Sequence, residues 1–544
     1  MNNNISNTYK KMKIKQSNVF YNYTLGFDLI NIDLVNTSKK LLKLGVCKFV
    51  FLSDYKCLYI NDSGQIKFEI IIPEGRKNDI EWAIDFQNIP IESHHDLNYS
   101  YQMVYHERKI SSEKVNYLRT FLPAIVLEDK SKQIVIYPSV KIYSDGIVVL
   151  SFQLDENWDN GIKEECFLND TINIVNRYFS NIWIDHRIQL LDAEIVLERA
   201  FEDNFSIAGK NIESRKNKKF KKVTFEKIIK SFQKEGKEFV FSNDSWILHK
   251  ITDSEKDKNL ESSLDLCRSI YSNAIKKIII PPKKSKKFSN EYVWQGRPSV
   301  SLLRFDEQPD NKRELVKYFS NSINKMIMRT NISKKLRKLP PDHRMFNDYC
   351  FHGSRSLLLW TWLKSKNSPD NAWDDPMTYF KIFSNQARAE QIEYYNMTLV
   401  RASYWAHNPL TEKHLIYAYR KLSSFEQSIL YCSASKEISD SISYFINIYG
   451  TQDLVLPAKD AAKFYIDQLR YKSDKLKKRS NDWMTFVFGI VGAASFADFI
   501  VSPIIQKLFP TFTEMITHLL SFGFSVILIF SVIILIYFFS GNNK

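Results

Sequence analysis

Glycine and proline are scarce in this chain, with 15 and 16 residues among 544. Flexible linkers are rich in such residues, so their scarcity favours well-formed helices and strands over long unstructured connections. At this length a single hydrophobic core is not expected, and the chain should divide into two or more domains. Hydrophobic residues make up 44 % and charged residues 25 %, as in ordinary globular proteins.

Several sequence signatures are also absent. The six cysteines form no CxxC pair, so neither a zinc site nor a redox motif is supported, and free thiols fit a reducing cytoplasm. The opening MNNNISNTYKKMKIKQSN has no apolar core, so we do not expect a signal peptide. Walker, GxGxxG, GxSxG and HExxH motifs do not occur, which removes the commonest phosphate-binding and hydrolytic chemistries. We therefore predict no cofactor and no metal site.

What the chain does have is positive charge, with a formal net charge of +15. Residues 483–544 contain two acidic and two basic residues, so the whole excess lies in residues 1–482. A basic soluble part suits anionic lipid headgroups or the phosphates of a nucleotide ligand. The abundance of lysine, asparagine and isoleucine is equally typical of compositional drift in AT-rich genomes, and both interpretations stay open.

Two long apolar segments lie near the C-terminal end, at Trp483–Ile505 and Leu519–Phe539. Each matches the roughly 20 residues that a helix needs to cross a bilayer. The basic segment RYKSDKLKKRS precedes the first, so the positive-inside rule places the large N-terminal part in the cytoplasm. Two spans return the C-terminus to the same side. The sequence therefore predicts a multi-pass protein of a bacterial-type inner (plasma) membrane.

The first apolar segment carries a face of small residues and one carboxylate, namely Gly489, Gly492, Ala493, Ser495 and Asp498. Small residues let helices approach closely in lipid, and an intramembrane carboxylate usually faces a bundle interior or a wet cavity. We therefore expect a homo-oligomer in which the first spans pack around an axis, with Asp498 near it. In the alternative interpretation, Asp498 lies close to the outer interface and reaches water there.

The patterns along the chain predict an α+β fold. We expect a disordered tail over 1–17, a β-rich α+β cytoplasmic domain over 18–160, a mixed, mainly helical domain with basic loops over 161–372, a helical stalk over 373–482, and a two-span membrane hairpin over 483–544. Asp145-Gly146 between two strand-like runs indicates a type I′ hairpin, and Asn31–Leu44 has the pattern of a helix. Because no glycine or proline occurs between Ala458 and Gly489, one helix is expected to continue from the stalk into the first span.

Basic runs in the 161–372 region are candidates for contact with phosphate groups or lipid headgroups. The lysines concerned are Lys218, Lys219, Lys221, Lys222, Lys283 and Lys284. A solvated surface is the commoner role for such runs.

This organisation, from the N-terminal α/β part through the stalk to the hairpin, resembles that of the CorA-like divalent-cation transporters. The resemblance implies an oligomeric two-helix pore gated by the cytoplasmic domain, with a divalent cation as the transported ion. In that family a Gly-Met-Asn motif at the outer end of the first span selects the cation. Here that end reads FIVSPIIQKLFP and has no such motif, so no selectivity residue is carried over.

The layout is also similar to that of CorA-like proteins associated with type III CRISPR systems. That resemblance implies a soluble part that senses a nucleotide signal, membrane disruption, and a role in antiviral defence. The partners expected are then the lipid bilayer, other copies of the chain and a nucleotide ligand, whereas nucleic acid is not expected.

Two other functions remain open. In one, the spans only tether a binding module to the membrane and form no pore. In the other, Arg401 and His407 in RASYWAHN have an Arg-x5-His spacing on a predicted helix, which resembles the motif of HEPN-type ribonucleases. Both residues of that motif contact the scissile phosphate, so the chain would be a membrane-anchored ribonuclease. The residue after the arginine is usually polar in that family, and here it is Ala402.

Overall fold

The structure is a computed structural model. It describes residues 9–61, 63–70, 73–74, 83–84, 96, 100, 115–129, 132–207, 236–241, 244–251, 263–281, 291–294, 296–331, 338–365, 369–433 and 435–541. The chain divides into two compact units, Met1–Asp460 and Ala461–Lys544, and each is described by itself.

The first unit contains the strands and most of the helices. Its strands are β1 (Lys13–Phe27), β2 (Phe49–Leu52), β3 (Lys56–Ile60), β4 (Ile66–Ile70), β5 (Pro73–Glu74), β6 (Ala83–Ile84), β7 (Tyr117–Phe121), β8 (Ile125–Asp129), β9 (Lys132–Tyr143), β10 (Ile147–Lys163), β11 (Asn181–Asp185), β12 (Gly236–Phe241), β13 (Asp244–Lys250), β14 (Glu291–Trp294), β15 (Pro298–Phe305), β16 (Tyr349–Gly353) and β17 (Leu358–Trp362). Its helices are α1 (Leu34–Lys43), α3 (Glu164–Phe167), η2 (Leu168–Ile172), η3 (Ile174–Asn176), α4 (His186–Ile207), α6 (Leu264–Ile278), α7 (Lys312–Ile327), η4 (Ala372–Asp374), α8 (Pro376–His407), α9 (Glu412–Ser423), α10 (Phe425–Leu430), α11 (Lys436–Tyr449) and η5 (Gln452–Leu454).

A large mixed sheet organises this unit. Its main path runs β12-β13-β11-β8-β9-β10-β1-β15-β17-β16. Strands β15 and β17 pair parallel, whereas the adjacent pairs β1–β15 and β16–β17 are antiparallel. The long strands β1, β9 and β10 form its centre, where Asn22 lies opposite Ser151. Strands from the N-terminal and middle parts of the chain thus share one sheet.

Both faces of β1 are buried, and the two faces differ in chemistry. Tyr21, Tyr23 and Leu25 point into the main apolar core, which α6 and α7 complete from the other side. The residues between them, Asn22 and Thr24, are buried but polar. Since side chains alternate along a strand, one face of the sheet is apolar and the other carries polar groups.

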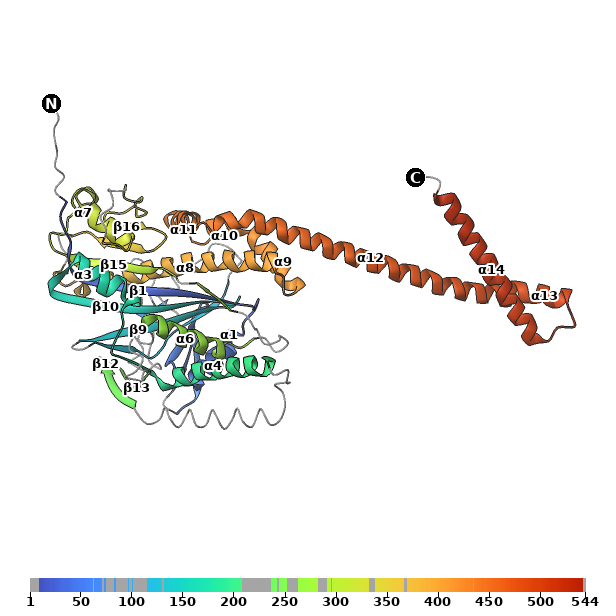
Figure 1. The fold of residues 1–544 in the computed structure, drawn as a ribbon, viewed down its shortest axis with the longest axis horizontal. Coiled ribbons are helices and arrows are strands. Elements are labelled where there is room, and N and C mark those ends of the chain that lie inside the picture. The colour runs from blue at the N-terminus through green and yellow to red at the C-terminus, as the bar shows by residue number, and fades with distance from the viewer. Residues whose placement is uncertain are drawn as a thin grey trace, which may run out of the picture. The chain divides into compact units, whose positions relative to one another are not determined.

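Helix α8 covers the polar face of the sheet, and α6 lies on the opposite face (Figure 1). Gln386 of α8 donates to the Asn22 Oδ1 atom at 2.7 Å, while the Phe152 ring meets the Tyr271 ring of α6 edge-on. Asp375 caps the start of α8, and the helix ends at His407, just before Asn408-Pro409. The sheet is therefore the middle layer between helices.

The hairpin at Asp145-Gly146 is confirmed, because β9 and β10 pair antiparallel on either side of it. The type I′ turn is wrong: Gly146 has φ +90°, but Asp145 is not among the residues with positive φ. A type I′ turn needs two such residues, whereas a longer loop closed by one left-handed glycine does not. A Cβ at Gly146 would also lie 2.5 Å from the Leu29 carbonyl oxygen, so the position requires glycine.

The described residues of the region 161–372, which was expected to be mixed and mainly helical, include seven strands, β11 to β17, and β15 pairs directly with β1. The sheet therefore crosses the expected domain boundary at 160, and residues 1–460 belong to one compact unit. The expected helix near Asn31–Leu44 is present as α1, and the helical stretch from 373 onward is present as well.

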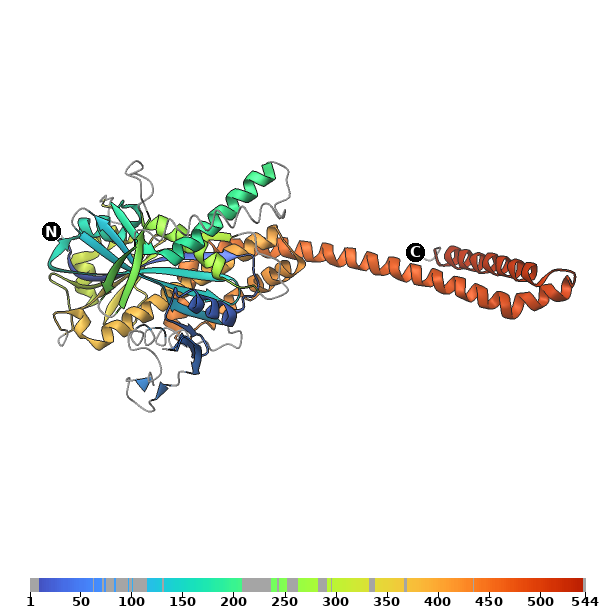
Figure 2. The same cartoon turned by 90° about the horizontal axis from the view of Figure 1, so that it is seen from below.

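The second unit is helical. Helix α12 (Val455–Phe496) begins at the end of the first unit and continues as η6 (Ala497–Val501), a π-helical turn, and α13 (Ser502–Leu508). After a short connection, α14 (Glu514–Gly541) folds back against η6 and α13 (Figure 2). The uninterrupted helix expected between Ala458 and Gly489 is confirmed by α12.

Candidate functional site in the apolar hairpin

One helical stretch of the described residues, Gln452–Leu508, is long and apolar enough to cross a membrane by length and composition. Only 13 % of its most apolar window is buried, which separates it from the core helix of a soluble domain. The side chains of Phe488 and Phe499 are 71 % and 84 % exposed. The expected first span lies inside this stretch, and the expected second span lies inside α14, of which Glu514–Leu528 is a shorter apolar segment.

The end of this stretch contains a local widening of the helix. Residues Ala497–Val501 form a π-helical turn, and Pro503 follows at the start of α13. Proline has no N–H to donate to the carbonyl four residues earlier, so the turn that precedes it cannot keep regular α-helical bonding. Such π-turns within helices are frequent at functional sites. Asp498 is the second residue of this turn.

Asp498 meets His518 of α14 across the hairpin. The His518 Nδ1 atom lies 3.1 Å from the Asp498 Oδ1 atom, although the two residues are 20 positions apart in the sequence. Both side chains are exposed, at 65 % for Asp498 and 52 % for His518. The exposed surface beside them is apolar, with Met515, Leu519 and Phe499 more than two-thirds exposed. The hairpin thus exposes this polar pair together with several large apolar side chains.

A row of small hydroxyl residues forms the inner side of α14. Thr517, Ser521 and Ser525 recur every four residues, and each is at most 1 % exposed. They are buried where α14 packs against η6, whose Ala497 and Val501 are buried as well. Small residues at such a contact allow close helix approach in lipid. The sequence analysis missed this row and His518, although the four-residue spacing on α14 was visible in the sequence.

Two glycines of the small-residue face predicted on the first apolar segment lie away from other atoms in the part of the chain that the structure describes. A Cβ added to Gly489 or Gly492 would meet no atom within 4 Å. Ser495 is exposed, and its hydroxyl donates to the Val491 carbonyl oxygen of its own helix. Ala493 lies on the same helix, and only its backbone is described. The structure thus places Asp498 in contact with His518 and leaves free space beside Gly489 and Gly492.

The predicted phosphate-contacting lysines, Lys218, Lys219, Lys221, Lys222, Lys283 and Lys284, all lie outside the described residues. A surface depression of about 420 Å³ lies between α10, α11 and η5. Its lining includes Glu426 and Asp440 and contains no lysine or arginine. This depression does not suit the phosphates of a nucleotide, which bind cationic groups.

Arg401 and His407 are not brought together on a surface. Arg401 is 1 % exposed and donates to the carbonyl oxygen of Asp145 at 2.7 Å. Its guanidinium also lies 3.6 Å from the Asp145 carboxylate. His407 is exposed at the end of α8, where its Nδ1 atom lies 2.8 Å from the Ser403 carbonyl oxygen. Arg401 therefore anchors α8 to the β9–β10 turn and does not face solvent, where an RNA phosphate would bind.

Buried ion pairs hold α8 against the sheet. The Glu390 carboxylate accepts two hydrogen bonds from the guanidinium of Arg119 in β7, one of them at 3.1 Å. It also lies 3.6 Å from the Nζ atom of Lys141 in β9. Burial alone would raise the pKa of Glu390, but the attraction of Arg119 and Lys141 outweighs it and lowers the pKa. These pairs are buried on both sides, so their role is to position the helix.

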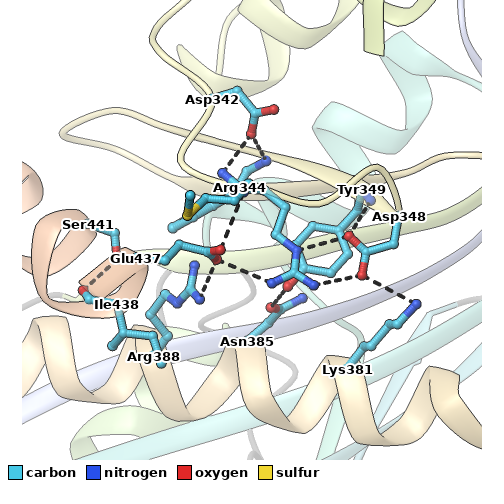
Figure 3. Close-up of polar contacts among 12 residues, drawn as sticks. Asp342, Arg344, Asp348, Tyr349, Lys381, Asn385, Arg388, Glu437, Ile438 and Ser441 are labelled. Carbon is cyan, nitrogen blue, oxygen red and sulfur yellow. Dashed lines mark hydrogen bonds and ion pairs between the residues drawn. The ribbon is translucent and has the colours of Figure 1, made fainter. Parts of the chain in front are cut away.

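A second ionic cluster connects α8, α11 and the loop before β16 (Figure 3). Glu437, in the first turn of α11, accepts from Arg388 of α8 at 2.9 Å and from Arg344 of the loop at 3.3 Å. Arg344 also binds Asp348 through two hydrogen bonds, and Lys381 of α8 lies 3.4 Å from the same carboxylate. Burial would raise the pKa of Glu437, but the two arginines hold it below its usual range. Helix α11, which leads into α12, is thereby fixed to α8.

Comparison with protein-family models, with curated proteins and with solved structures finds no match to this chain.

Proposed function

We propose that this chain is a membrane-embedded effector or channel, in which copies assemble through the apolar hairpin and the first unit controls the assembly from the cytoplasm. The carrying observation is the Asp498–His518 pair, which is exposed on a hairpin that also exposes the large apolar side chains of Met515, Leu519 and Phe499. A charged group facing lipid tails is costly, so such groups usually face protein or a water-filled cavity. Other copies of the hairpin would supply that environment.

The open glycines on α12 support the same proposal. Gly489 and Gly492 have free space where a side chain would be, and they precede Asp498 on one continuous helical stretch. A helix from another copy could approach closely there, as small residues permit in membranes. The assembly would then bring the hairpins of several copies together.

The expected orientation rests on the charges at the start of the first apolar segment. Six basic residues precede it, namely Arg470, Lys472, Lys475, Lys477, Lys478 and Arg479. They are exposed on α12, and the connection between α13 and α14 has no comparable cluster. The positive-inside rule then puts the first unit in the cytoplasm. With α14 as a second span, the C-terminus returns to the same side.

Control by the first unit would act through α12. This helix begins at Val455, six residues after α11 ends at Tyr449, and it continues into the apolar segment. Since Glu437 fixes α11 to α8, a change at the sheet face of α8 could alter where α12 begins. A nucleotide signal in antiviral defence is the trigger implied by the resemblance to CorA-like proteins associated with type III CRISPR systems.

The test is leakage from liposomes that contain the reconstituted full-length protein. We expect release of an entrapped small dye or of K⁺ at protein concentrations that give several copies per vesicle. The control is the chain without residues 481–544, which should neither insert nor cause release. A full-length protein that inserts but stays monomeric in detergent and releases nothing would contradict the proposal and favour a simple membrane tether.

A further inference from the structure

Four basic residues lie on α12 shortly before the first apolar segment, and we call them the collar: Lys475, Lys477, Lys478 and Arg479. They belong to a stretch in which every residue from Asp467 to Thr485 is exposed. Arg470, farther back on the helix, lies 3.9 Å from Asp467, whereas no collar residue has a carboxylate oxygen within 4 Å among the described residues. The described part of the chain thus leaves the four collar charges without a close counter-charge.

The acidic residues beside the collar do not cancel its charge. Asp474 and Asp482 flank it, so residues 474–482 contain four basic and two acidic side chains, a net charge of +2. Lys475 is three positions from Lys478 and four from Arg479, and like charges at these spacings on one helix repel each other. An anion from outside the chain would relieve this repulsion.

The position of the collar relative to the apolar segment defines where such an anion would lie. Trp483 begins the segment with a side chain that is 68 % exposed, and tryptophan favours the boundary between headgroups and lipid tails. Lys477, Lys478 and Arg479 precede it by six, five and four positions on the same helix. These positions correspond to about 6 to 9 Å along the helix axis. With the segment in a bilayer, these side chains would lie at the level of the lipid phosphates.

The directions of the three nearest cations indicate the kind of partner. Residues 477, 478 and 479 are consecutive, and consecutive side chains on an α-helix point about 100° apart. They therefore face three directions around α12, and one flat protein surface could not contact all of them. A headgroup layer surrounds a helix that crosses it and contacts every side, which favours lipid over a second protein.

We infer that the collar binds the phosphate groups of anionic phospholipids in the leaflet that the helix enters. The inference rests on the proposed function, because the collar meets headgroups only where the apolar segment lies in a bilayer. The ligand class is a phospholipid whose headgroup has a net negative charge, such as phosphatidylglycerol. Ammonium and guanidinium groups donate charge-assisted hydrogen bonds to phosphate oxygens, and no ammonium of the lipid itself competes for them.

The experiment uses the full-length protein in phosphatidylcholine vesicles that contain a trace of spin-labelled lipid. Electron paramagnetic resonance measures the fraction of label that the protein immobilises, and hence the association of phosphatidylglycerol relative to phosphatidylcholine. For the unmodified protein we expect a preference for phosphatidylglycerol of about fivefold, the factor by which one basic residue strengthens binding at an anionic surface. The preference should disappear in about 1 M NaCl, where charges are screened within a few ångströms.

Two triple variants remove the same charges at different places on α12. The first replaces by glutamine the collar residues nearest Trp483, in Lys477→Gln, Lys478→Gln and Arg479→Gln, and should bring the preference close to one. The second lies 11 to 20 positions before Trp483, about 17 to 30 Å along the helix, and should keep the preference. It consists of Lys463→Gln, Arg470→Gln and Lys472→Gln. All six side chains are exposed, and oligomer size in detergent is compared for both variants.

The outcomes separate the inference from the proposed function. The inference is overturned if the unmodified protein shows no preference, if the first variant keeps it, or if both variants lose it equally. It is also overturned if inorganic pyrophosphate at matched ionic strength abolishes the preference, because the collar would then be a site for a soluble anion. In these cases a protein that inserts and releases dye leaves the proposed function standing. If the unmodified protein does not insert into vesicles, both fail.

Discussion

At the scale of single residues, the most demanding groups in the first unit are the charges buried beneath α8. Glu390, Arg119 and Lys141 are each at most 1 % exposed, and the attraction between the Glu390 carboxylate and the two cations offsets part of the loss of water. Removing one member of a buried pair usually costs more than the pair itself contributes, because the remaining charge is left without a partner.

Glu390→Gln should therefore destabilise the first unit by about 3 kcal/mol, because it removes the buried carboxylate that pairs with Arg119 and Lys141. The measurement is equilibrium urea unfolding of the full-length protein in detergent, followed by tryptophan fluorescence. Glu426→Gln, at an exposed position of α10, is the matched control and should change the free energy of unfolding by less than about 0.5 kcal/mol. Equal effects of the two substitutions would contradict the ion-pair account.

His343 makes stability depend on pH. Burial lowers its pKa to about 4, with His352 acting in the same direction and Asp342 opposing it. The unfolded chain thus takes up the proton at higher pH than the folded one, so stability should fall as the pH drops from about 6.5 to about 4. His343→Gln should make the fall in melting temperature over this range shallower. His249 and His414 also have pKa values lowered by burial and keep part of the dependence in the variant.

The residues of the candidate site were only partly visible in the sequence. Asp498 could be singled out because a lone carboxylate in an apolar segment is conspicuous. His518 could not, because its contact depends on how the chain turns between α13 and α14 and on the π-turn that directs Asp498. For Arg401 the sequence was misleading. Its spacing to His407 fits the Arg-x5-His motif, but its buried side chain donates a hydrogen bond to the Asp145 carbonyl oxygen.

At the scale of elements, long patterned segments were the most predictable. The stalk helices follow from the helical spacing of apolar residues, and the continuous α12 follows from the lack of glycine and proline between Ala458 and Gly489. The β9–β10 hairpin follows from the Asp145-Gly146 pair. The strand β11 was missed because its five residues lie directly before α4, and a short apolar run gives no period of its own. Pairing of β15 with β1 joins residues nearly 300 positions apart, which no local pattern indicates.

Gly489 and Gly492 of α12, which have open space where a side chain would be, give a prediction about assembly. Gly489→Leu and Gly492→Leu should each shift the protein in detergent towards monomers, because the added side chain keeps a second helix at a distance. Neither substitution meets an atom of its own chain within 4 Å of the new Cβ, so the fold of the single chain should not change. Light scattering coupled to size exclusion gives the mass of the protein.

Gly523→Leu on α14 is the matched control, since its Cβ space is equally open but it lies off the predicted face. It should leave the oligomer intact. Variants at Gly489 and Gly492 that assemble like the unmodified protein would show that copies do not meet through this face of α12.

At the scale of the whole molecule, the chain combines a sheet-based unit of residues 1–460 with a helical unit of residues 461–544. Helix α12 crosses the boundary between the two units. In the proposed function, a conformational change in the first unit would reach the second through this helix. The first unit has charged side chains on its surface, such as Lys11 and Glu307, whereas large apolar side chains such as Phe488, Phe499 and Met515 are exposed in the apolar part of the second unit. This difference in surface chemistry is the physical basis of the proposal that the apolar hairpin lies in lipid.

The most direct test of the account is the arrangement of copies when the full-length protein is imaged as single particles in lipid nanodiscs. The account predicts several copies around one axis, with the α12 segments that carry Gly489, Gly492 and Asp498 closest to it. A single copy in each disc, or an assembly held together by the first unit with separate hairpins, would contradict it.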